Sequence, residues 1–203
     1  MSPVLLVPNL VLRTPAKLVA AIDKRVLDII KDMEKTLLAA KSPAGVGLAA
    51  PQIGILLRLF LIRPLPDKTI TLFINPEIIK YSQKTQSPSK NRGTYEGCLS
   101  LPGHYAPVTR SISVTVKYQT QVQDRSQSLL AKSPQAPAED LRSQQDAGEI
   151  RLVEKTETFS GFPAHIIQHE MDHLNGILFI DRVLEQNAKL FKAEGDSWHE
   201  VTL

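Results

Sequence analysis

Six consecutive residues near the end of the chain, the segment Q-H-E-M-D-H at 168–173, place the strongest constraint on the fold. His169 and His173 are four residues apart, so on an α-helix both imidazoles project from the same face. Glu170 would then lie beside a cation held between the two rings, where it can accept a proton from water. This is the H-E-x-x-H pattern of zinc-type hydrolases. It predicts a helix that supplies two metal ligands and a base.

A catalytic metal site usually needs a third protein ligand and keeps one position open. Downstream, Phe179 occupies the position of a third histidine, and Glu194 is the nearest acidic candidate. Upstream, Cys98 lies in the sequence Glu-Gly-Cys-Leu-Ser, where the glycine lets the backbone bend and aim the sulfur. A solitary cysteine is more often a small buried apolar residue. One thiolate and two imidazoles nevertheless form a suitable set of three ligands, which favours Cys98 over Glu194.

The bulk composition is that of an ordinary globular protein. Hydrophobic residues make up 42% of the 203 residues and charged residues 22%, which argues against wholesale disorder. The single cysteine excludes an internal disulfide and fits a reducing compartment. The net charge of +3 comes without a compact basic block, so we expect no direct nucleic-acid site. We see neither a signal-peptide pattern nor a bilayer-length apolar run, and we expect a cytoplasmic protein without membrane contact.

Apolar spacing predicts the order of the elements. Residues 1–22 are expected to form an extended arm, and Asp23 to cap a helix over 24–41 that buries one stripe. Strands are expected at 56–62, at 69–74 where Asn75-Pro76 ends the strand, from 78 onward, at 112–118 and at about 150–159. Residues 177–180 are interpreted as a short strand or turn, followed by a short helix around 183–191.

Residues 119–148 differ in composition from the rest of the chain. They are rich in Gln, Ser, Ala, Pro and charged residues, and no apolar periodicity persists beyond Leu130. A stretch of this length without periodicity is typical of an insertion, a lid or a disordered segment. We therefore predict a single domain over 1–203, with a flexible insertion that joins two strands of a hairpin.

Residues 45–54 contain three glycines, and the start, Gly-Val-Gly-Leu-Ala-Ala, nearly matches a dinucleotide-binding fingerprint. That fingerprint needs a strand before it and a helix opening after it. Here a helix precedes the segment and Pro51 interrupts the chain directly after it, so we exclude the dinucleotide interpretation. Two interpretations stay open: a loop whose backbone approaches a ligand closely, and a tight packing turn.

Three segments together resemble the signature motifs of peptide deformylase, in the family's order. They are G-V-G-L-A-A-P-Q at 45–52, E-G-C-L-S at 96–100 and Q-H-E-M-D-H at 168–173, and the resemblance covers most of residues 5–184. It implies an α+β fold in which antiparallel β-sheets pack around the central H-E-x-x-H helix, with the N-terminal helix outside. It also implies removal of the formyl group from the N-terminal methionine of newly made polypeptides.

The resemblance assigns one divalent metal ion to Cys98, His169 and His173. It favours Fe²⁺, with Zn²⁺ as the alternative and Ni²⁺ or Co²⁺ as active substitutes, since sulfur and imidazole ligands suit both iron and zinc. Metal-activated hydroxide is then expected to attack the formyl carbon.

The remaining catalytic roles are also implied by the resemblance. Glu170 would act as the general base and acid. The Gln52 side-chain amide and the Leu99 backbone N–H would donate hydrogen bonds to the developing oxyanion.

The substrate contacts implied by the resemblance involve the glycine loop and the motif helix. Val46 and Gly47 would present backbone groups to an N-formylmethionyl nascent peptide, and the enzyme would associate transiently with the ribosome. Phe162 and Ile166 are candidates for the apolar pocket that holds the methionine side chain. Two rival functions stay open at this point: a general H-E-x-x-H metallopeptidase, and a non-catalytic relative that binds metal or peptide.

Three further residues have two interpretations each, and a fourth, Tyr105, departs from the family's pattern. Glu96 either orients a metal-binding histidine or is a surface carboxylate. Arg110 either pairs with Asp172 or is a solvated charge. His165 either lines the pocket or competes as a ligand. Tyr105 occupies a position where many family members carry an arginine, which puts one contact with the substrate peptide in doubt.

Overall fold

The computed structural model describes residues 1–41, 44–64, 69–86, 95–123, 150–195 and 197–202. The helices are η1 (Leu10–Arg13), α1 (Lys24–Ala39), η2 (Ala50–Ile53), α2 (Phe162–Leu174) and α3 (Phe179–Glu185), where η denotes a 3₁₀ helix. The strands are β1 (Gly47–Ala49), β2 (Leu59–Ile62), β3 (Thr71–Tyr81), β4 (Thr85–Gln86), β5 (Glu96–Cys98), β6 (Leu101–Ala106), β7 (Arg110–Ser111), β8 (Ser113–Gln123), β9 (Ile150–Ser160), β10 (Leu190–Glu194) and β11 (Ser197–Val201). No helix in these ranges is long and apolar enough to span a bilayer.

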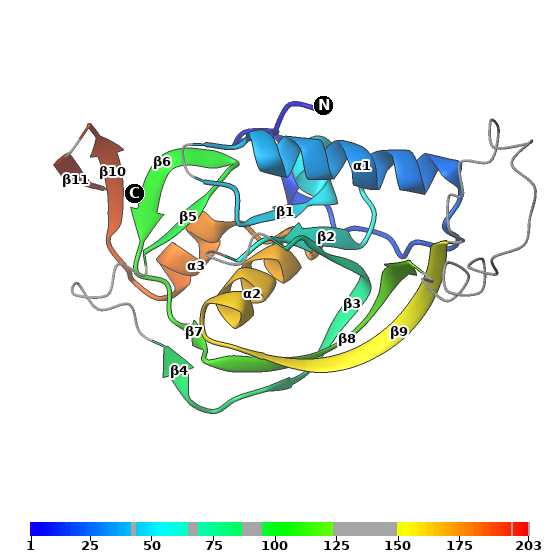
Figure 1. Cartoon of the computed structure of the whole chain (residues 1–203). Helices are drawn as coiled ribbons and strands as arrows, with labels where there is room; N and C mark the ends of the chain where they lie inside the picture. The colour runs from blue at the N-terminus through cyan, green and yellow to red at the C-terminus, as the bar shows by residue number, and fades with distance from the viewer. Residues whose placement is uncertain (42–43, 65–68, 87–94, 124–149, 196, 203) are drawn as a thin grey trace, which may run out of the picture.

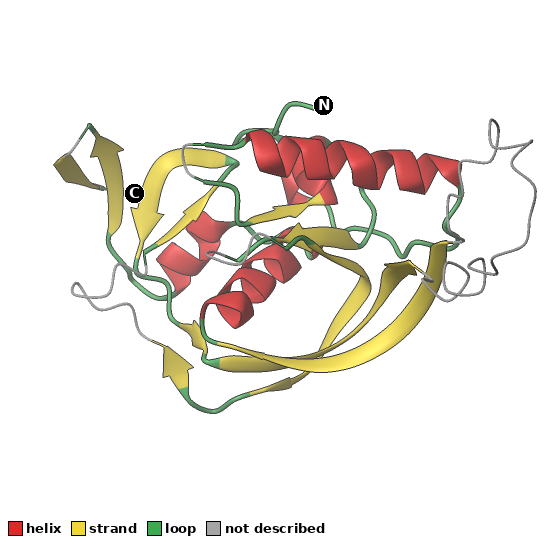
Figure 2. Ribbon diagram, viewed as in Figure 1, coloured by secondary structure: helices red, strands yellow, loops and turns green. Residues whose placement is uncertain are grey.

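The strands form antiparallel sheets around α2, which confirms the predicted α+β class. The larger sheet has the order β1-β2-β3-β8-β9, and the second has the order β11-β10-β6-β5. In Figure 1, β3, β8 and β9 curve beneath α2, while α1 lies on the outside of the molecule. The secondary-structure colouring in Figure 2 shows α2 enclosed by strands on several sides. The helix with the H-E-x-x-H motif is therefore central, as expected.

Strand β2 explains how the core has two layers. Its four residues, Leu59, Phe60, Leu61 and Ile62, are all 2% exposed or less. Side chains alternate between the two faces of a strand. Leu59 and Leu61 therefore pack with the apolar stripe of α1, and Phe60 and Ile62 pack with α2. Because both faces of β2 are buried, every position of the strand is apolar, and its sequence is a continuous apolar run.

Helix α1 begins where the sequence predicts. The Asp23 side chain accepts a hydrogen bond from the Val26 N–H at 2.9 Å, which satisfies one of the free donors at the helix start. Val26, Ile30, Met33 and Leu37 form its buried face. The apolar face of α1 therefore covers one side of the β1-β2-β3 layer.

Strand β3 is longer than predicted, because Asn75-Pro76 does not end it. The pairing with β8 shifts register between Ile74 and Glu77, and Asn75 has a positive φ of 49°. Asn75 compensates for the irregularity through its side chain, which accepts from the Val19 N–H at 2.8 Å and donates to the Val19 carbonyl at 2.9 Å. A β-bulge thus accommodates the proline, and the expected separate strand from residue 78 is part of β3.

The predicted hairpin around the insertion is confirmed. Strands β8 and β9 pair continuously from Ser113↔Ser160 to Gln123↔Ile150. The first strand extends beyond residue 118, because it continues to pair with β9. The predicted insertion at 119–148 lies mainly outside the described residues, which stop at 123 and resume at 150.

The C-terminal part contains the expected short helix, but the predicted position was wrong. Helix α3 begins within the strand or turn expected at 177–180 and ends at Glu185, and the Leu178 N–H donates to the Asp181 side chain at 2.7 Å at its start. Strands β10 and β11 pair with each other, so residues 190 and 191 of the expected helix lie in a strand instead. The pairing of β10 with β6 through Phe191↔Tyr105 explains the difference, since this tertiary contact is not visible in local periodicity.

Candidate metal centre

Helix α2 buries both its apolar and its polar faces. Pro163 lies in its first turn, and Gly176, with a φ of 72°, follows its last turn. Ile167 packs into the core with the curved sheet. The motif residues His169, Glu170 and His173 are each 7% exposed or less. A helix of this kind needs specific partners for its polar side chains.

The structure brings Cys98, His169 and His173 together. One potential ligand atom from each residue lies within 4.8 Å of the others, and Cys98 Sγ is 3.2 Å from His173 Nε2. The β5-β6 pairing shifts register between Gly97 and Cys98, and this bulge turns the sulfur toward α2. Glu194 is not in this group; it lies on β10 and pairs with Lys192 at 2.7 Å.

The charges of these residues match a cation site. Burial opposes ionisation of the Cys98 thiol, but the nearby His173 and His169 rings hold its pKa well below its ordinary value. Burial also opposes a charged His169 ring, while Glu96 and Cys98 raise its pKa well above its ordinary value. The site therefore favours a thiolate surrounded by positive charge. A divalent cation with deprotonated ligands supplies the same positive charge, so the donor set fits a metal ion.

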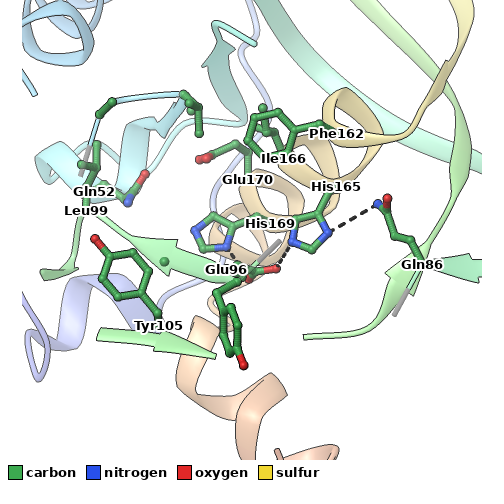
Figure 3. Close-up of a pocket in the computed structure, with 15 residues that line it drawn as sticks. Gln52, Gln86, Glu96, Leu99, Tyr105, Phe162, His165, Ile166, His169 and Glu170 are labelled. Carbon is green, nitrogen blue, oxygen red and sulfur yellow. Dashed lines mark hydrogen bonds and ion pairs between the residues drawn. The ribbon is translucent and has the colours of Figure 1, made fainter. Parts of the chain in front are cut away.

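Glu96 orients the first histidine of the motif. Its Oε1 atom is 2.6 Å from His169 Nδ1, an interaction marked by a dashed line in Figure 3, so Nε2 is the ring nitrogen that remains for a metal ion. Arg110 donates to both carboxylate oxygens of Glu96, at 2.6 and 2.8 Å, and to Asp172 at 2.9 Å. Burial would raise the pKa of Glu96, but Arg110 and His169 hold it well below its ordinary value. Glu96 is thus a buried carboxylate, and the predicted pair of Arg110 and Asp172 exists.

Glu170 lies against the glycine loop. A Cβ atom at Gly47 would lie 2.1 Å from Glu170 Oε1 and 2.8 Å from a methyl carbon of Ile166, so only glycine fits this position. The Glu170 Oε2 atom is buried without a hydrogen-bond partner among the described residues. Burial raises the pKa of Glu170 to about 7, against the opposing effect of His169 and His173. A carboxylate in this environment exchanges protons near neutral pH.

Gln52 points its amide nitrogen toward the centre. Its Oε1 atom accepts a hydrogen bond from the Ala49 N–H at 2.8 Å. This bond leaves Nε2 directed at the metal-binding side, 3.7 Å from Cys98 Sγ and 3.3 Å from Ser100 Oγ. Leu99 follows the ligand cysteine directly and lines the same cavity. The two predicted oxyanion donors therefore lie on the cysteine side of the site.

A cavity of about 350 Å³ opens beside the centre. Figure 3 shows Gln52 and Leu99 at one end of it and Gln86 at the other. Phe162 and Ile166 line it as predicted, and Phe162 remains 44% exposed at its mouth. The cavity can hold one extended side chain beside the motif helix.

His165 also lines this cavity, and the group of potential metal ligands does not include it. Its Nε2 atom is 2.6 Å from Glu96 Oε2, and its Nδ1 atom is 3.4 Å from Gln86 Nε2. The pocket interpretation of His165 is therefore supported, with Glu96 as its main partner. Gln86 was not anticipated, because it lies in a polar stretch, 82–93, whose sequence suggests only a surface loop.

Comparison with known proteins identifies the family. A sequence model of polypeptide deformylase matches residues 1–136 and 146–189. A peptide deformylase from Agrobacterium fabrum is 37% identical over 90% of this chain and 86% of its own length.

Two solved structures agree with this match. A peptide deformylase from Synechococcus elongatus, in complex with actinonin, has a TM-score of 0.66 at 34% identity and covers 92% of this chain and 82% of its own. A class I type b peptide deformylase from Acinetobacter baumannii, bound to Met-Ala-Ser, has a TM-score of 0.64 at 30% identity and covers 90% and 98% of the two chains. The chain belongs to the polypeptide deformylase family, whose members remove the N-formyl group from nascent polypeptides.

Proposed function

We propose that residues 1–203 work as one catalytic domain in which Cys98, His169 and His173 hold a single divalent cation next to Glu170. The observation that carries this proposal is the approach of the three ligand atoms to within 4.8 Å, with Gly47 leaving room for the Glu170 carboxylate. The substrate is the formylmethionyl end of a nascent peptide. The products are formate and a free α-amine.

The ion that we propose is Fe²⁺. Soft sulfur and imidazole ligands suit both ferrous iron and zinc, and the resemblance to the family favours iron. When bound, the ion supplies Lewis acidity that activates water for attack on the formyl carbon. Glu96 would keep the His169 ring in the tautomer that leaves Nε2 unprotonated for the ion.

Glu170 moves the proton in the proposed mechanism. Its carboxylate accepts a proton from the attacking water and then delivers it to the departing amine nitrogen. The residue is 3% exposed, so the proton is exchanged with substrate atoms in the cavity and bulk water is kept away. One side chain thus serves as base and then as acid.

Gln52 and Leu99 stabilise the oxygen of the formyl group as charge develops on it. The Gln52 amide is held in place by the Ala49 N–H at 2.8 Å, so no reorganisation is needed when the transition state forms. The Leu99 backbone N–H is the second proposed donor. Both groups lie close to Cys98, since Gln52 Nε2 is 3.7 Å from its sulfur and Leu99 follows it directly in sequence.

The peptide is proposed to lie between two free strand edges. Strand β1 ends the larger sheet and β5 ends the second one, and Gly47 and Gly97 from these strands both line the cavity. The Val46 carbonyl accepts from the Arg63 N–H at 2.7 Å and thus faces β2. Because backbone groups alternate along a strand edge, Gly47 presents its own N–H and carbonyl to the peptide. Val46 contributes mainly its side chain.

The methionine side chain is proposed to occupy the end of the cavity near Phe162 and Ile166. A flexible apolar thioether fits a pocket of this kind. Since formylated chains emerge from ribosomes, we propose a cytoplasmic location and transient association with the ribosome.

Incubation of the purified protein with formyl-Met-Ala-Ser tests the function. Samples loaded with Fe²⁺ or Ni²⁺ without oxygen should release formate and free amine in equal amounts. A general metallopeptidase would cleave internal peptide bonds instead, and a non-catalytic relative would bind the ion without turnover. Absence of amine release from both metal-loaded samples contradicts the proposed function.

A further inference from the structure

Four aromatic side chains gather on one face of the second sheet: Tyr95, Tyr105, Phe191 and Trp198, here termed the aromatic cluster. Tyr105 and Trp198 are stacked, with ring centroids 4.8 Å apart and an angle of 19° between the ring planes. The Tyr95 ring meets Trp198 and Phe191 edge-on, at 5.3 and 5.7 Å. The cluster therefore links the β5-β6 turn region to the C-terminal hairpin.

The side chains of β5 alternate between this face and the face that carries Glu96 and Cys98, and the cavity beside this edge strand reaches residues of both faces. Glu96 and Cys98 of β5 point toward α2, so Gly97 between them faces the other side of the strand. Tyr105 pairs with Gly97 across the two strands, and a Cβ at Gly97 would lie 2.8 Å from its ring. The glycine thus lets the Tyr105 ring lie directly on the backbone beside the ligand cysteine.

The aromatic cluster is continuous with the substrate cavity. Tyr95 and Tyr105 both line the cavity that contains Gln52 and Glu170. Trp198 extends the aromatic surface outward and is 46% exposed. A peptide whose first residue occupies the cavity can extend along the part of the wall that holds Tyr95 and Tyr105. The exposed ring is therefore placed where the next residues of the substrate would pass.

We propose that the aromatic cluster binds the second and third residues of the formylmethionyl peptide and favours apolar and aromatic side chains there. This inference rests on the proposed function. The charged side chains among the described residues of the cavity wall belong to the proposed metal centre, and the wall beside Gly97 includes the aromatic residues Tyr95 and Tyr105. Such a surface binds apolar and aromatic side chains through stacking and apolar burial, and it provides little stabilisation for a charged side chain.

Trp198 reports on this binding directly, because the chain contains one tryptophan. Titration of the metal-loaded protein with the product peptide Met-Phe-Phe should change the Trp198 fluorescence to saturation. Met-Ser-Ser should bind about fivefold more weakly, a ratio in the range of one aromatic pair interaction. Saturable binding of Met-Phe-Phe without any change in fluorescence overturns the proposal.

Activity measurements test the same inference by a second route. The ratio of kcat/KM for formyl-Met-Phe-Phe to that for formyl-Met-Ser-Ser should fall about fivefold in Trp198→Ala and be largely retained in Trp198→Phe. Tyr81→Ala is the matched control, because Tyr81 is a 56% exposed aromatic residue on β3 and should leave the ratio unchanged.

Three results separate the alternatives. An equal loss for both peptides in Trp198→Ala, without a change in their ratio, assigns Trp198 a purely structural role and overturns the proposal. A dimer in sedimentation that Trp198→Ala dissociates shows that a second copy covers the cluster, which also overturns it. If the wild type hydrolyses neither peptide, the proposed function fails, while the fluorescence titration still tests the peptide surface.

Discussion

Glu96 Oε1 lies 2.6 Å from Nδ1 of His169, within a fully buried part of the protein. The same carboxylate accepts two hydrogen bonds from Arg110 and lies 2.6 Å from His165 Nε2. Both carboxylate oxygens of Glu96 are therefore held by contacts with other side chains of the protein. The orientation of His169 depends on a charge network that extends well beyond the ligand itself.

Substitution of Glu96 is expected to weaken the metal site without removing a ligand. In Glu96→Gln the side-chain amide can donate to His169 Nδ1 and so favours the wrong tautomer. We expect the affinity for the metal ion to fall about 10- to 100-fold, as measured by competition with a chelator. Wild-type affinity in a folded Glu96→Gln variant would show that the carboxylate has no orienting role.

Arg110 is predicted to contribute to stability through the two carboxylates that it neutralises. Arg110→Met leaves Glu96 buried without its main cationic partner, so the free energy of unfolding should fall by about 3–5 kcal/mol in urea denaturation. Arg182→Met is the matched control. Arg182 also pairs with Asp172, but its side chain is 29% exposed, and the expected loss is about 1 kcal/mol. Equal losses in the two variants would contradict this explanation.

Gly47→Ala is predicted to impair catalysis while the metal stays bound. The added methyl carbon would lie 2.1 Å from Glu170 Oε1, so the carboxylate must move. A displacement of about 1 Å at a catalytic group costs on the order of 100-fold in kcat. The metal content, determined on the same sample, should remain that of the wild type. Full activity in this variant would mean that Glu170 is not held against the glycine loop.

The methionine pocket is tested by the preference between formyl-Met and formyl-Gly peptides. Phe162→Ala and Ile166→Ala remove apolar surface from the cavity wall, so the preference should fall about 10-fold. Ile167→Ala is the control, because Ile167 is buried on the same helix but does not line the cavity. It should lower stability and leave the preference intact. An unchanged preference in both pocket variants would place the methionine elsewhere.

Much of the fold could be predicted because its local signals agree with its packing. The apolar stripe and the Asp23 cap define α1, and the alternation over 112–118 defines the start of β8. At Asn75 the local signal was misleading. The proline there suggests a strand end, but the bulge and the hydrogen bonds to Val19 let β3 continue. Those compensating contacts come from residues 56 positions away in sequence and leave no local pattern.

The candidate site could also be predicted only in part. Motif spacing and ligand chemistry reduce the candidate ligands to a few residues, and the structure brings the predicted Cys98, His169 and His173 together. The positions of Gln86 and Trp198 could not be predicted, since each depends on tertiary pairing of short strands. Gln86 reaches the cavity through the β4-β7 pair, and Trp198 reaches Tyr105 through β10.

The proposed mechanism depends above all on Glu170, which transfers the proton beside a cation held by Cys98, His169 and His173. Paired measurement of metal content and turnover of formyl-Met-Ala-Ser, on Glu170→Gln and wild-type protein prepared without oxygen, tests this role most directly. We expect one metal ion per chain in both proteins, with kcat lower by about 10²- to 10⁴-fold in the variant. Near wild-type turnover in metal-loaded Glu170→Gln would contradict the mechanism.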